Sequence, residues 1–477
     1  MKPNNFKKVD FFILGFIIFI ALVLRLYKIN IPLGDLHSWR QADTASVGRN
    51  FIKSGFDLFH PRYDDLSNVQ SGFENPQGYR MVEFPLYNAI FAYAYKLVPS
   101  IPLEQWGRLV SVFFSLITIA VIYFLCLKEK DRLTAFFAGL IYSVFPFFVF
   151  FSRVVLPESA ALGFTFLAIF FLYLNPENLI LYLLSMASFA AALLIKPTAI
   201  FFSLPLAYIF FQADRGRFLK RPFFYFYFIL SFLPLFWWRD YIKAYPEGIP
   251  VNEWLITSVN TGAGLQKIFF RPAFFRWIFF ERINNMILGG LTTAFLVIGA
   301  VAKQKKFLFL TILLSSLIYL FVFQGGNVQH EYYQTLILPA LAIFSALGIS
   351  FLFENKKTIS FFLVIFLVPA VLALSWFFSY YQVKDYYNYS QELVQEAKIL
   401  ESLTQPDDKI VTDRMGDTTL LYLAERRGAP AFYREPESLQ SIGYQYLVTS
   451  SQEAINTLKE KRYQLVFEND KFSLFKL

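Results

Sequence analysis

Long apolar runs recur along most of the chain, and their length predicts helices that cross a membrane. A helix needs about 20 apolar residues to span a bilayer core of roughly 30 Å. The chain has about eleven runs of this kind, some separated by only a few residues. They lie near residues 10–29, 106–127, 133–152, 157–174, 178–195, 197–213, 222–238, 284–302, 307–324, 333–353 and 358–381. We therefore predict a polytopic α-helical membrane protein.

The first run follows basic residues, as the apolar part of a secretory signal peptide does. These are Lys2, Lys7 and Lys8, but no small-residue cleavage site comes after the apolar residues. A removable signal peptide needs such a site. We therefore expect a retained helix.

Basic residues gather in alternate loops, and this bias predicts the orientation of the helices. Lys and Arg collect in short cytoplasmic loops. With the N-terminus inside, the inner loops carry Lys128, Lys130, Arg132, Arg215, Arg217, Lys220, Arg221, Lys303, Lys305, Lys306, Lys356 and Lys357. The short loops on the other side hold only Arg153 and Lys196. We therefore expect a multi-pass protein of the plasma or inner membrane, with its C-terminus and the long segments 30–105 and 239–283 on the extracytoplasmic side.

The composition excludes a soluble or a disordered chain. Of the 477 residues, 56% are hydrophobic and 17% charged, whereas soluble domains carry about 25% charged residues. A single cysteine, Cys126, excludes an internal disulfide and a Cys-based zinc site. The three histidines are too scattered along the chain to suggest a metal site by spacing.

After residue 381 the composition becomes that of a soluble domain. Residues 382–477 hold 12 Lys+Arg and 15 Asp+Glu, a net charge of −3, so of the overall +9 the residues before them carry +12. Because the inner loops explain most of that excess, we expect no nucleic-acid partner. The apolar spacing predicts a small α/β domain. Its helices are expected at 390–403, 417–425 and 452–460, its strands at 409–413 and 446–449, and a hairpin pairs 464–467 with 472–475. We therefore divide the chain into a transmembrane domain, 1–381, and an extracytoplasmic domain, 382–477.

Segment 30–105 places two carboxylates next to predicted helices that lie along the membrane surface. Ala45–Lys53 and Pro85–Leu97 have the alternation of such helices. Asp43 stands before the first and Glu83 before the second. Taken alone, Asp43 is typical of a helix N-cap, and Glu83 of an interfacial ion pair. Near a bilayer, however, carboxylates are costly unless they face water, a partner or a substrate, so the two together favour chemistry.

Further polar residues fall on the same predicted side of the membrane. A structural ion pair or a side chain snorkelling to the interface explains any one of them equally well. Their common side favours an extracytoplasmic polar site. They are Arg153, Glu158, Lys196, His330 and Glu331.

These motifs, in this order, resemble those of the polytopic GT-C glycosyltransferases, specifically the protein O-mannosyltransferase-like family 39 and its bacterial relatives. The lipid A aminoarabinose transferases are a neighbouring branch. The resemblance covers about residues 10–380. Its pieces are Ser-Trp-Arg-Gln-Ala-Asp-Thr at 38–44, Glu-Phe-Pro-Leu-Tyr at 83–87, Arg-Val-Val-Leu-Pro-Glu at 153–158, Ile-Lys-Pro at 195–197, His-Glu-Tyr-Tyr at 330–333, and Pro339.

The resemblance implies a GT-C-like fold of about eleven transmembrane helices, with interfacial helices in the first outer loop. It also implies an inverting transfer of sugar from a polyprenyl-phosphate donor in the outer leaflet to an acceptor hydroxyl on a lipid, glycan or protein. By the family pattern, Asp43 is the candidate general base. Glu83 shares that task or positions the acceptor or a divalent metal ion, and no cofactor is firmly required.

A departing lipid phosphate needs fixed cations or donors near its developing charge. The candidates are Lys196, Arg153, Arg40 and His330 for this phosphate, and Glu158, Glu331 and Tyr333 for other substrate contacts. The chain departs from the family pattern at two positions. Asp43-Thr44 stands where many members have Asp-Glu, and Glu158 where many have Asp.

Two other functions use similar features. A polysaccharide polymerase or ligase takes pyrophosphate-linked donors, and a flippase moves a lipid-linked sugar without cleaving it. Transporters often contain inverted repeats, and the two halves of this chain show none. The glycosyltransferase is therefore the preferred hypothesis.

Overall fold

The computed structural model describes residues 7–214, 216–251, 267–303, 306–356 and 358–477. Of the basic residues named above, Lys2 and the inner-loop residues Arg215, Lys305 and Lys357 lie outside the described residues, as does 252–266 of the second outer segment. Contacts divide the chain into two units. The helical unit comprises Met1–Ile29, Arg108–Trp238 and Leu255–Tyr386, and the mixed unit comprises Asn30–Gly107, Arg239–Trp254 and Tyr387–Leu477.

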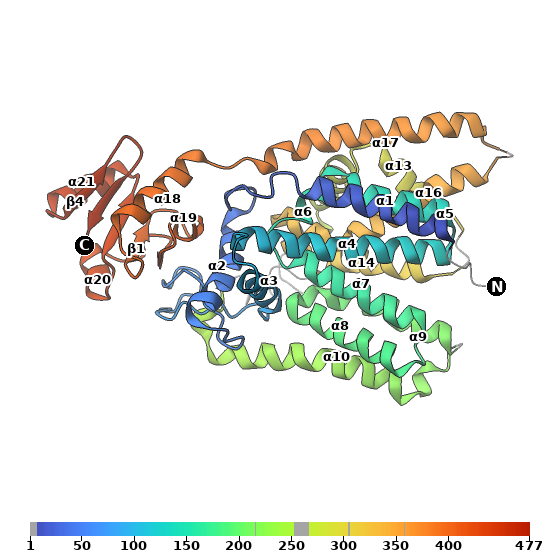
Figure 1. Ribbon diagram of the computed structural model, residues 1–477, viewed down its shortest axis with the longest axis horizontal. Coiled ribbons are helices and arrows are strands. Elements are labelled where there is room, and N and C mark those ends of the chain that lie inside the picture. The colour runs from blue at the N-terminus through green and yellow to red at the C-terminus, as the bar shows by residue number, and fades with distance from the viewer. Residues whose placement is uncertain (1–6, 215, 252–266, 304–305, 357) are drawn as a thin grey trace. The chain divides into compact units, whose positions relative to one another are not determined.

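The first part of the helical unit is a series of apolar helices that lie side by side (Figure 1). They are α1 (Lys8–Arg25), α4 (Leu103–Glu129), α5 (Arg132–Val144), α6 (Pro146–Phe151), α7 (Glu158–Leu174), α8 (Leu179–Ile195), η1 (Pro197–Phe202), α9 (Ser203–Ala213), η2 (Phe218–Lys220) and α10 (Pro222–Tyr241). Local sequence sets their starts. Asp131 caps α5 by accepting from the Thr134 amide, and Asn178 caps α8 in the same way. Proline opens α6, η1 and α10, since its missing N–H costs nothing in a first turn.

The second part of this unit contains η6 (Ile268–Phe270), α12 (Pro272–Phe275), η7 (Arg276–Ile287), α13 (Thr292–Val301), α14 (Leu308–Val322), α15 (Gln324–Gln329), η8 (Glu331–Ile337), α16 (Leu338–Glu354) and α17 (Phe361–Val383). Helices α13 and α16 cross at two glycines. A Cβ on Gly299 would stand 1.9 Å from the Phe344 carbonyl oxygen, and one on Gly348 would stand 1.9 Å from the Phe295 carbonyl oxygen. Small residues thus let the two backbones touch, as in other membrane helix pairs.

Within the described residues, three helical stretches are long and apolar enough to cross a membrane: Leu103–Glu129, Glu331–Glu354 and Phe361–Leu403. A fourth is possible if Pro272–Ile287 and Thr292–Val301, bent by 119°, form one broken span. The other apolar helices of 10–17 residues are shorter. The predicted helical class is therefore confirmed, but the count of about eleven spans is not.

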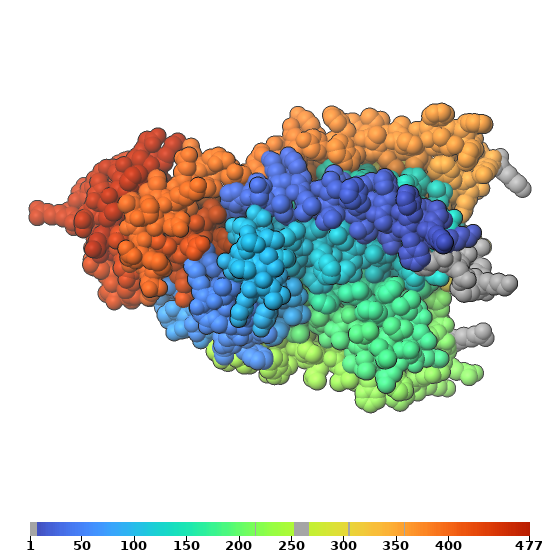
Figure 2. Space-filling view, in the orientation of Figure 1, coloured from blue at the N-terminus to red at the C-terminus, as the bar shows by residue number. Residues whose placement is uncertain are grey.

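Helix α17 shows what the apolar surface of this unit looks like. It forms a ridge (orange in Figure 2), and Phe362 and Phe366 on it are 76% and 73% exposed. Such exposure of large apolar side chains along a whole helix is costly in water and is what a lipid-facing helix shows. The surface of the unit thus agrees with a membrane protein.

The mixed unit combines two helices of the first outer segment with a small α/β fold. Its helices are α2 (Ser38–Ser54), α3 (Leu86–Leu97), η3 (Ile242–Ala244), η4 (Pro246–Gly248), α18 (Gln391–Leu403), α19 (Thr419–Leu423), α20 (Pro436–Ser441) and α21 (Gln452–Glu460), and η9 (Lys384–Tyr387) leads into it. Its strands are β1 (Lys409–Thr412), β2 (Arg427–Ala429), β3 (Tyr446–Thr449), β4 (Gln464–Glu468) and β5 (Ser473–Lys476). The sheet order is β2-β1-β3-β5-β4, with β1 parallel to β2 and β3, and β5 antiparallel to β3 and β4.

Each face of this sheet carries its own apolar core, because side chains alternate along a strand. Ile410 packs with residues of α18 and α19, whereas its neighbour Val411 packs with residues of α20 and α21. The helices predicted at 390–403 and 452–460, the strands and the hairpin are confirmed, and the helix predicted at 417–425 is confirmed as the shorter α19. Strand β2 and helix α20 were not predicted. The three residues of β2, Arg-Gly-Ala, and the polar run of α20, Pro-Glu-Ser-Leu-Gln-Ser, lack a clear apolar period.

The first outer segment extends the sheet at its β2 edge. Asp65 forms a parallel bridge with Gly428. The Leu66 amide donates to the Gly428 carbonyl at 2.7 Å, and the Gly428 amide donates to the Asp64 carbonyl at 2.9 Å. Residues 30–107 and 387–477 therefore fold as one unit, while the division at 381/382 rests on composition and stays a prediction.

Candidate active site

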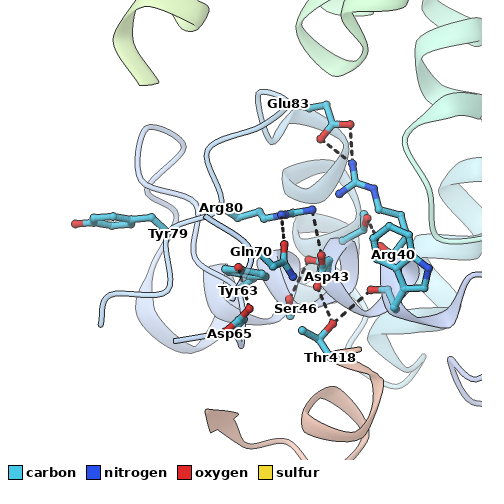
Figure 3. Close-up of polar contacts among 12 residues, drawn as sticks. Arg40, Asp43, Ser46, Tyr63, Asp65, Gln70, Tyr79, Arg80, Glu83 and Thr418 are labelled. Atoms are coloured by element: carbon cyan, nitrogen blue, oxygen red, sulfur yellow. Dashed lines mark hydrogen bonds and ion pairs between the residues drawn. The ribbon is translucent and has the colours of Figure 1, made fainter. Parts of the chain in front are cut away.

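Asp43 lies in the second turn of α2 and is 1% exposed. The Thr418 hydroxyl donates to Asp43 Oδ1 at 2.6 Å, and Arg80 Nη2 stands 3.1 Å from Asp43 Oδ2 (Figure 3). The N-cap interpretation of Asp43 is wrong, because α2 begins at Ser38 with His37 in the N-cap position. The stretch from Ser38 to Ala42 contains no Gly or Pro to stop the helix, so the helix extends well upstream of the predicted Ala45.

Arg80 is the cation next to Asp43, and the sequence interpretation missed it. Its Nη1 donates to Gln70 Oε1 at 2.8 Å, and its guanidinium lies 5.2 Å from the centre of the Tyr63 ring. The loop between α2 and α3 therefore orients Arg80 toward the carboxylate (Figure 3). Among the described residues, Asp43 Oδ2 has this ion pair but accepts no hydrogen bond.

A second buried acid, Asp65, lies in the same cluster. Its Oδ1 accepts from the Ser67 amide at 2.8 Å and from the Ser67 hydroxyl at 2.6 Å, and its Oδ2 accepts from the Tyr63 hydroxyl at 3.3 Å. Burial raises the pKa of Asp65 to about 7, and the negative charge of Asp43 adds to this rise while the Ser67 hydrogen bonds oppose it. The neighbourhood of Asp43 thus contains a carboxyl group that titrates near neutral pH.

Glu83 and Arg40 form a separate ion pair in the mixed unit. Arg40 Nη2 lies 2.6 Å from Glu83 Oε1 and 2.8 Å from Glu83 Oε2, and the two side chains are 9% and 15% exposed. Arg40 precedes Asp43 by three residues on α2, so the two side chains leave the same side of the helix. The interpretation of Glu83 as an ion-pair partner is confirmed, and its partner is a residue predicted to bind phosphate.

In the helical unit, Lys196 and Glu158 form a buried pair. Lys196 Nζ lies 2.8 Å from Glu158 Oε1, and the side chains are 7% and 2% exposed. Glu158 begins α7, and Lys196 is the C-cap residue that follows α8. Lys196 Nζ also stands 5.2 Å from the centre of the Tyr333 ring. Three predicted site residues, Lys196, Glu158 and Tyr333, therefore lie in contact or close to one another.

The remaining predicted residues of this unit occupy other positions. Arg153 is buried, donates from Nη2 to the Lys28 carbonyl at 3.0 Å and lies 6.0 Å from the centre of the Phe150 ring. Glu331 Oε1 pairs with Arg282 Nη2 at 3.3 Å. The His330 ring stacks on that of Tyr332 with centroids 5.2 Å apart. In the described ranges, no group of three or more His, Cys, Asp and Glu side chains is placed to hold a metal ion.

Two neighbours of Asp43, Arg80 and Thr418, were not among the predicted site residues. Arg80 stands three positions before Glu83, inside an aromatic and polar stretch, so an arginine next to the second acid was a usable signal. Thr418 had no such signal, since it lies 375 residues from Asp43 in sequence.

Comparison with known proteins shows which fold the chain shares. Residues 84–238, about a third of the chain, match the family model described as dolichyl-phosphate-mannose-protein mannosyltransferase. None of the curated proteins compared with the chain matches it. Among solved structures, ArnT from Cupriavidus metallidurans bound to undecaprenyl phosphate is similar, with a TM-score of 0.65, 14% identity, and 97% of each chain covered.

Two further structures share the fold. For oligosaccharyltransferase AglB from Archaeoglobus fulgidus, in complex with an inhibitory peptide and a dolichol-phosphate, the TM-score is 0.60 at 12% identity, with 93% of this chain and 69% of that one covered. For arabinofuranosyltransferase AftD from Mycobacteria the TM-score is 0.57 at 11% identity, with 97% of this chain and 41% of that one covered. The predicted resemblance to the GT-C glycosyltransferases is confirmed: the chain has their fold over nearly its whole length.

Proposed function

We propose that the protein is an integral-membrane glycosyltransferase that moves a sugar from a polyprenyl-phosphate donor to an acceptor hydroxyl. Three findings support this proposal. The family model that matches residues 84–238 is described as dolichyl-phosphate-mannose-protein mannosyltransferase. The similar ArnT structure holds undecaprenyl phosphate, and the AglB structure holds a dolichol-phosphate. Both structures share a fold with this chain, and each holds a lipid phosphate.

The observation that carries the proposal is the arrangement of Asp43, buried, fixed at Oδ1 and paired with Arg80 at Oδ2. In the proposed step, the acceptor O–H proton passes to Asp43 Oδ2. The acceptor oxygen bonds to the anomeric carbon as the bond from that carbon to the phosphate oxygen breaks, and the phosphate keeps the electron pair. Attack from the face opposite the phosphate inverts the anomeric configuration. A base in this role contributes about 10²–10⁴-fold in rate.

Access to this carboxylate requires a movement. Because Asp43 is 1% exposed, an acceptor reaches Oδ2 only after a neighbouring side chain moves away. Arg80 is that side chain, since its Nη2 occupies the Oδ2 side of the carboxylate. An arginine displaced toward solvent or toward the donor keeps its charge, and the freed carboxylate becomes a stronger proton acceptor.

For the donor phosphate, we propose Lys196 as the main cation. Its Nζ pairs with Glu158 and lies 5.2 Å from the centre of the Tyr333 ring, so two side chains fix its position. Arg153, Arg40 and His330 are the further candidates, and Glu331 is a candidate for substrate contact. We further propose that the acceptor side is extracytoplasmic, with the N-terminus in the cytoplasm, as the loop charges predict.

The test is transfer of labelled sugar by the purified protein. Undecaprenyl-phosphate-linked hexoses and pentoses serve as donors, an envelope extract serves as acceptor, and a pyrophosphate-linked donor separates this function from that of a polymerase. Asp43→Asn is expected to lower the rate about 10²–10⁴-fold in protein that is still folded, with a thermal midpoint that falls because Arg80 loses its carboxylate partner. Asp10→Asn, at another carboxylate paired with an arginine, is the matched control and is expected to keep activity. Full activity of Asp43→Asn would refute Asp43 as the base.

A further inference from the structure

We propose that Thr418 is a positioning residue for Asp43, so that the C-terminal α/β segment completes the active site. This inference rests on the proposed function, because it takes Asp43 as the base. It assigns a role to residues 387–477, in which the sequence shows no catalytic spacing.

The contact itself is short and shielded from water. Thr418 Oγ1 lies 2.6 Å from Asp43 Oδ1, and the two residues are 2% and 1% exposed. The same hydroxyl lies 3.4 Å from the Trp39 carbonyl, which is long for an O–H···O bond. A hydroxyl has one proton to donate, so the carboxylate is its partner. Hydrogen bonds to a charged acceptor are about twice as strong as neutral ones.

The position of Thr418 is set by the α/β fold and not by the outer segment. Thr418 precedes α19, and its carbonyl accepts from the Tyr422 amide at 3.0 Å. The next residues of that helix, Leu420 and Leu421, are buried in the core on one face of the sheet. The hydroxyl is thus attached to a rigid element, as a group that orients a base should be.

Other contacts fix how α2 lies against α19. Arg49 on α2 donates from Nη1 to the Tyr422 carbonyl at 2.7 Å, and its guanidinium lies 4.3 Å from the centre of the Tyr422 ring. At the sheet edge, Gly428 pairs with Asp65, and a Cβ at Gly428 would stand 1.8 Å from the Ile410 carbonyl oxygen. These contacts leave α2 little freedom to slide relative to Thr418.

The consequence concerns the two oxygens of Asp43. With Oδ1 held by Thr418, the carboxylate cannot rotate about its Cβ–Cγ bond without losing that hydrogen bond. Oδ2 therefore remains the atom that faces Arg80 and takes the proton. Without the hydroxyl, Oδ1 is left buried with no donor, which makes the ionised form of the base less favourable.

Three variants test this inference. Thr418→Val removes the hydroxyl at nearly constant volume, and Thr418→Ser keeps it. Thr419→Val is the matched control, because Thr419 is the next residue and equally buried, and its hydroxyl has no hydrogen-bond partner among the described residues. The measurements are kcat and KM for the donor, the pH–rate profile and the thermal midpoint.

We expect Thr418→Val to lower kcat about tenfold to a hundredfold with an unchanged KM for the donor. In the pH–rate profile of this variant, the acidic limb should move to higher pH, because the Asp43 carboxylate has lost a donor that stabilises its charge. Thr418→Ser should return kcat to within about threefold of the wild type and restore the profile, and Thr419→Val should resemble the wild type. In an Asp43→Asn background, Thr418→Val should cause no further loss, since both changes act on one group.

A wild-type rate and profile for Thr418→Val would overturn the inference, as would a Thr418→Ser variant as slow as Thr418→Val. An additive loss in the double variant would also overturn it. The outcome for the proposed function is separate: it fails if Asp43→Asn is fully active, whatever Thr418 does. If Asp43→Asn is inactive and Thr418→Val is normal, only the present inference fails.

Discussion

Each of the two units buries a carboxylate against a cation at the candidate site, Asp43 with Arg80 in the mixed unit and Glu158 with Lys196 in the helical unit, and the surroundings of the two pairs differ. Asp43 has Arg80 on one oxygen and the Thr418 hydroxyl on the other, whereas both Glu158 oxygens lack a hydrogen bond among the described residues and depend on the Lys196 charge. Arg80 is itself held at Nη1 by Gln70.

Because of this difference, the two buried ion pairs suit different tasks. A carboxylate with a neutral donor keeps one oxygen fixed when its cation leaves, which suits a base. A lysine is a compact charge that rotates freely on a flexible stem, which suits the capture of a phosphate. Since burying a pair costs roughly what the attraction returns, neither pair is explained by stability alone.

The largest effect is expected from Lys196→Met. It removes the ion-pair partner that Glu158 has among the described residues, and removing one partner of a buried pair costs about 3–5 kcal/mol. We therefore expect a strongly lowered thermal midpoint in detergent and loss of donor binding. The double variant Lys196→Met with Glu158→Gln should regain the midpoint but not the binding, measured by retention of labelled undecaprenyl phosphate. Normal binding by the folded double variant would show that Lys196 serves structure only.

A smaller effect is expected from Glu83→Gln. This substitution removes one charge of a pair whose side chains are 9% and 15% exposed. If Glu83 positions the acceptor, transfer falls about tenfold through KM for the acceptor. The matched control is Glu425→Gln, which breaks the exposed pair of Lys53 and Glu425. Surface pairs contribute about 0–1 kcal/mol, so the control should leave rate and midpoint unchanged. An unchanged KM in Glu83→Gln would limit Glu83 to its contact with Arg40.

A third effect concerns the pH dependence of stability and involves Asp65. Its pKa is raised from 3.8 to about 7 in the folded protein, so between these values the native state binds a proton that the unfolded chain does not. Stability therefore decreases as pH rises from about 4 to about 7. Asp65→Asn removes this titration and should raise the thermal midpoint relative to the wild type more at pH 8 than at pH 5. An equal difference at both pH values would contradict the raised pKa.

The sequence predicted correctly those helix starts that depend on residues close by in the chain. The helix α3 starts after Pro85, as the alternation and the proline indicate, and α21 has a Ser451 N-cap that accepts from the Ala454 amide. The start of α2 was missed, because nothing between Ser38 and Ala45 is amphipathic enough to mark a helix. Its residues are buried on nearly all sides, and an amphipathic period is lost when a helix is fully enclosed.

The site residues that were predicted and those that were missed differ in the same way. Asp43, Glu83 and Lys196 stood out because a charge near a predicted membrane boundary is conspicuous in sequence. The partners of Asp43 were missed: Arg80 offered only its place three positions before Glu83, and Thr418 contacts Asp43 through tertiary packing that no spacing rule describes. The sequence also could not show which predicted residues pair with one another. Arg40, predicted to bind phosphate, has Glu83 as a carboxylate partner.

The bridge between Asp65 and Gly428 also has a consequence for biosynthesis. The first outer segment leaves the ribosome early, whereas β2 and Thr418 are made several hundred residues later. Contacts so distant in sequence form slowly, because a long loop must close before they contribute. Until then, Asp43 lacks its hydroxyl partner and the helix that carries it lacks its packing against Tyr422. In a nascent chain the surroundings of Asp43 therefore stay incomplete during insertion, and the proposed base acquires its hydroxyl partner only after the C-terminal segment has folded.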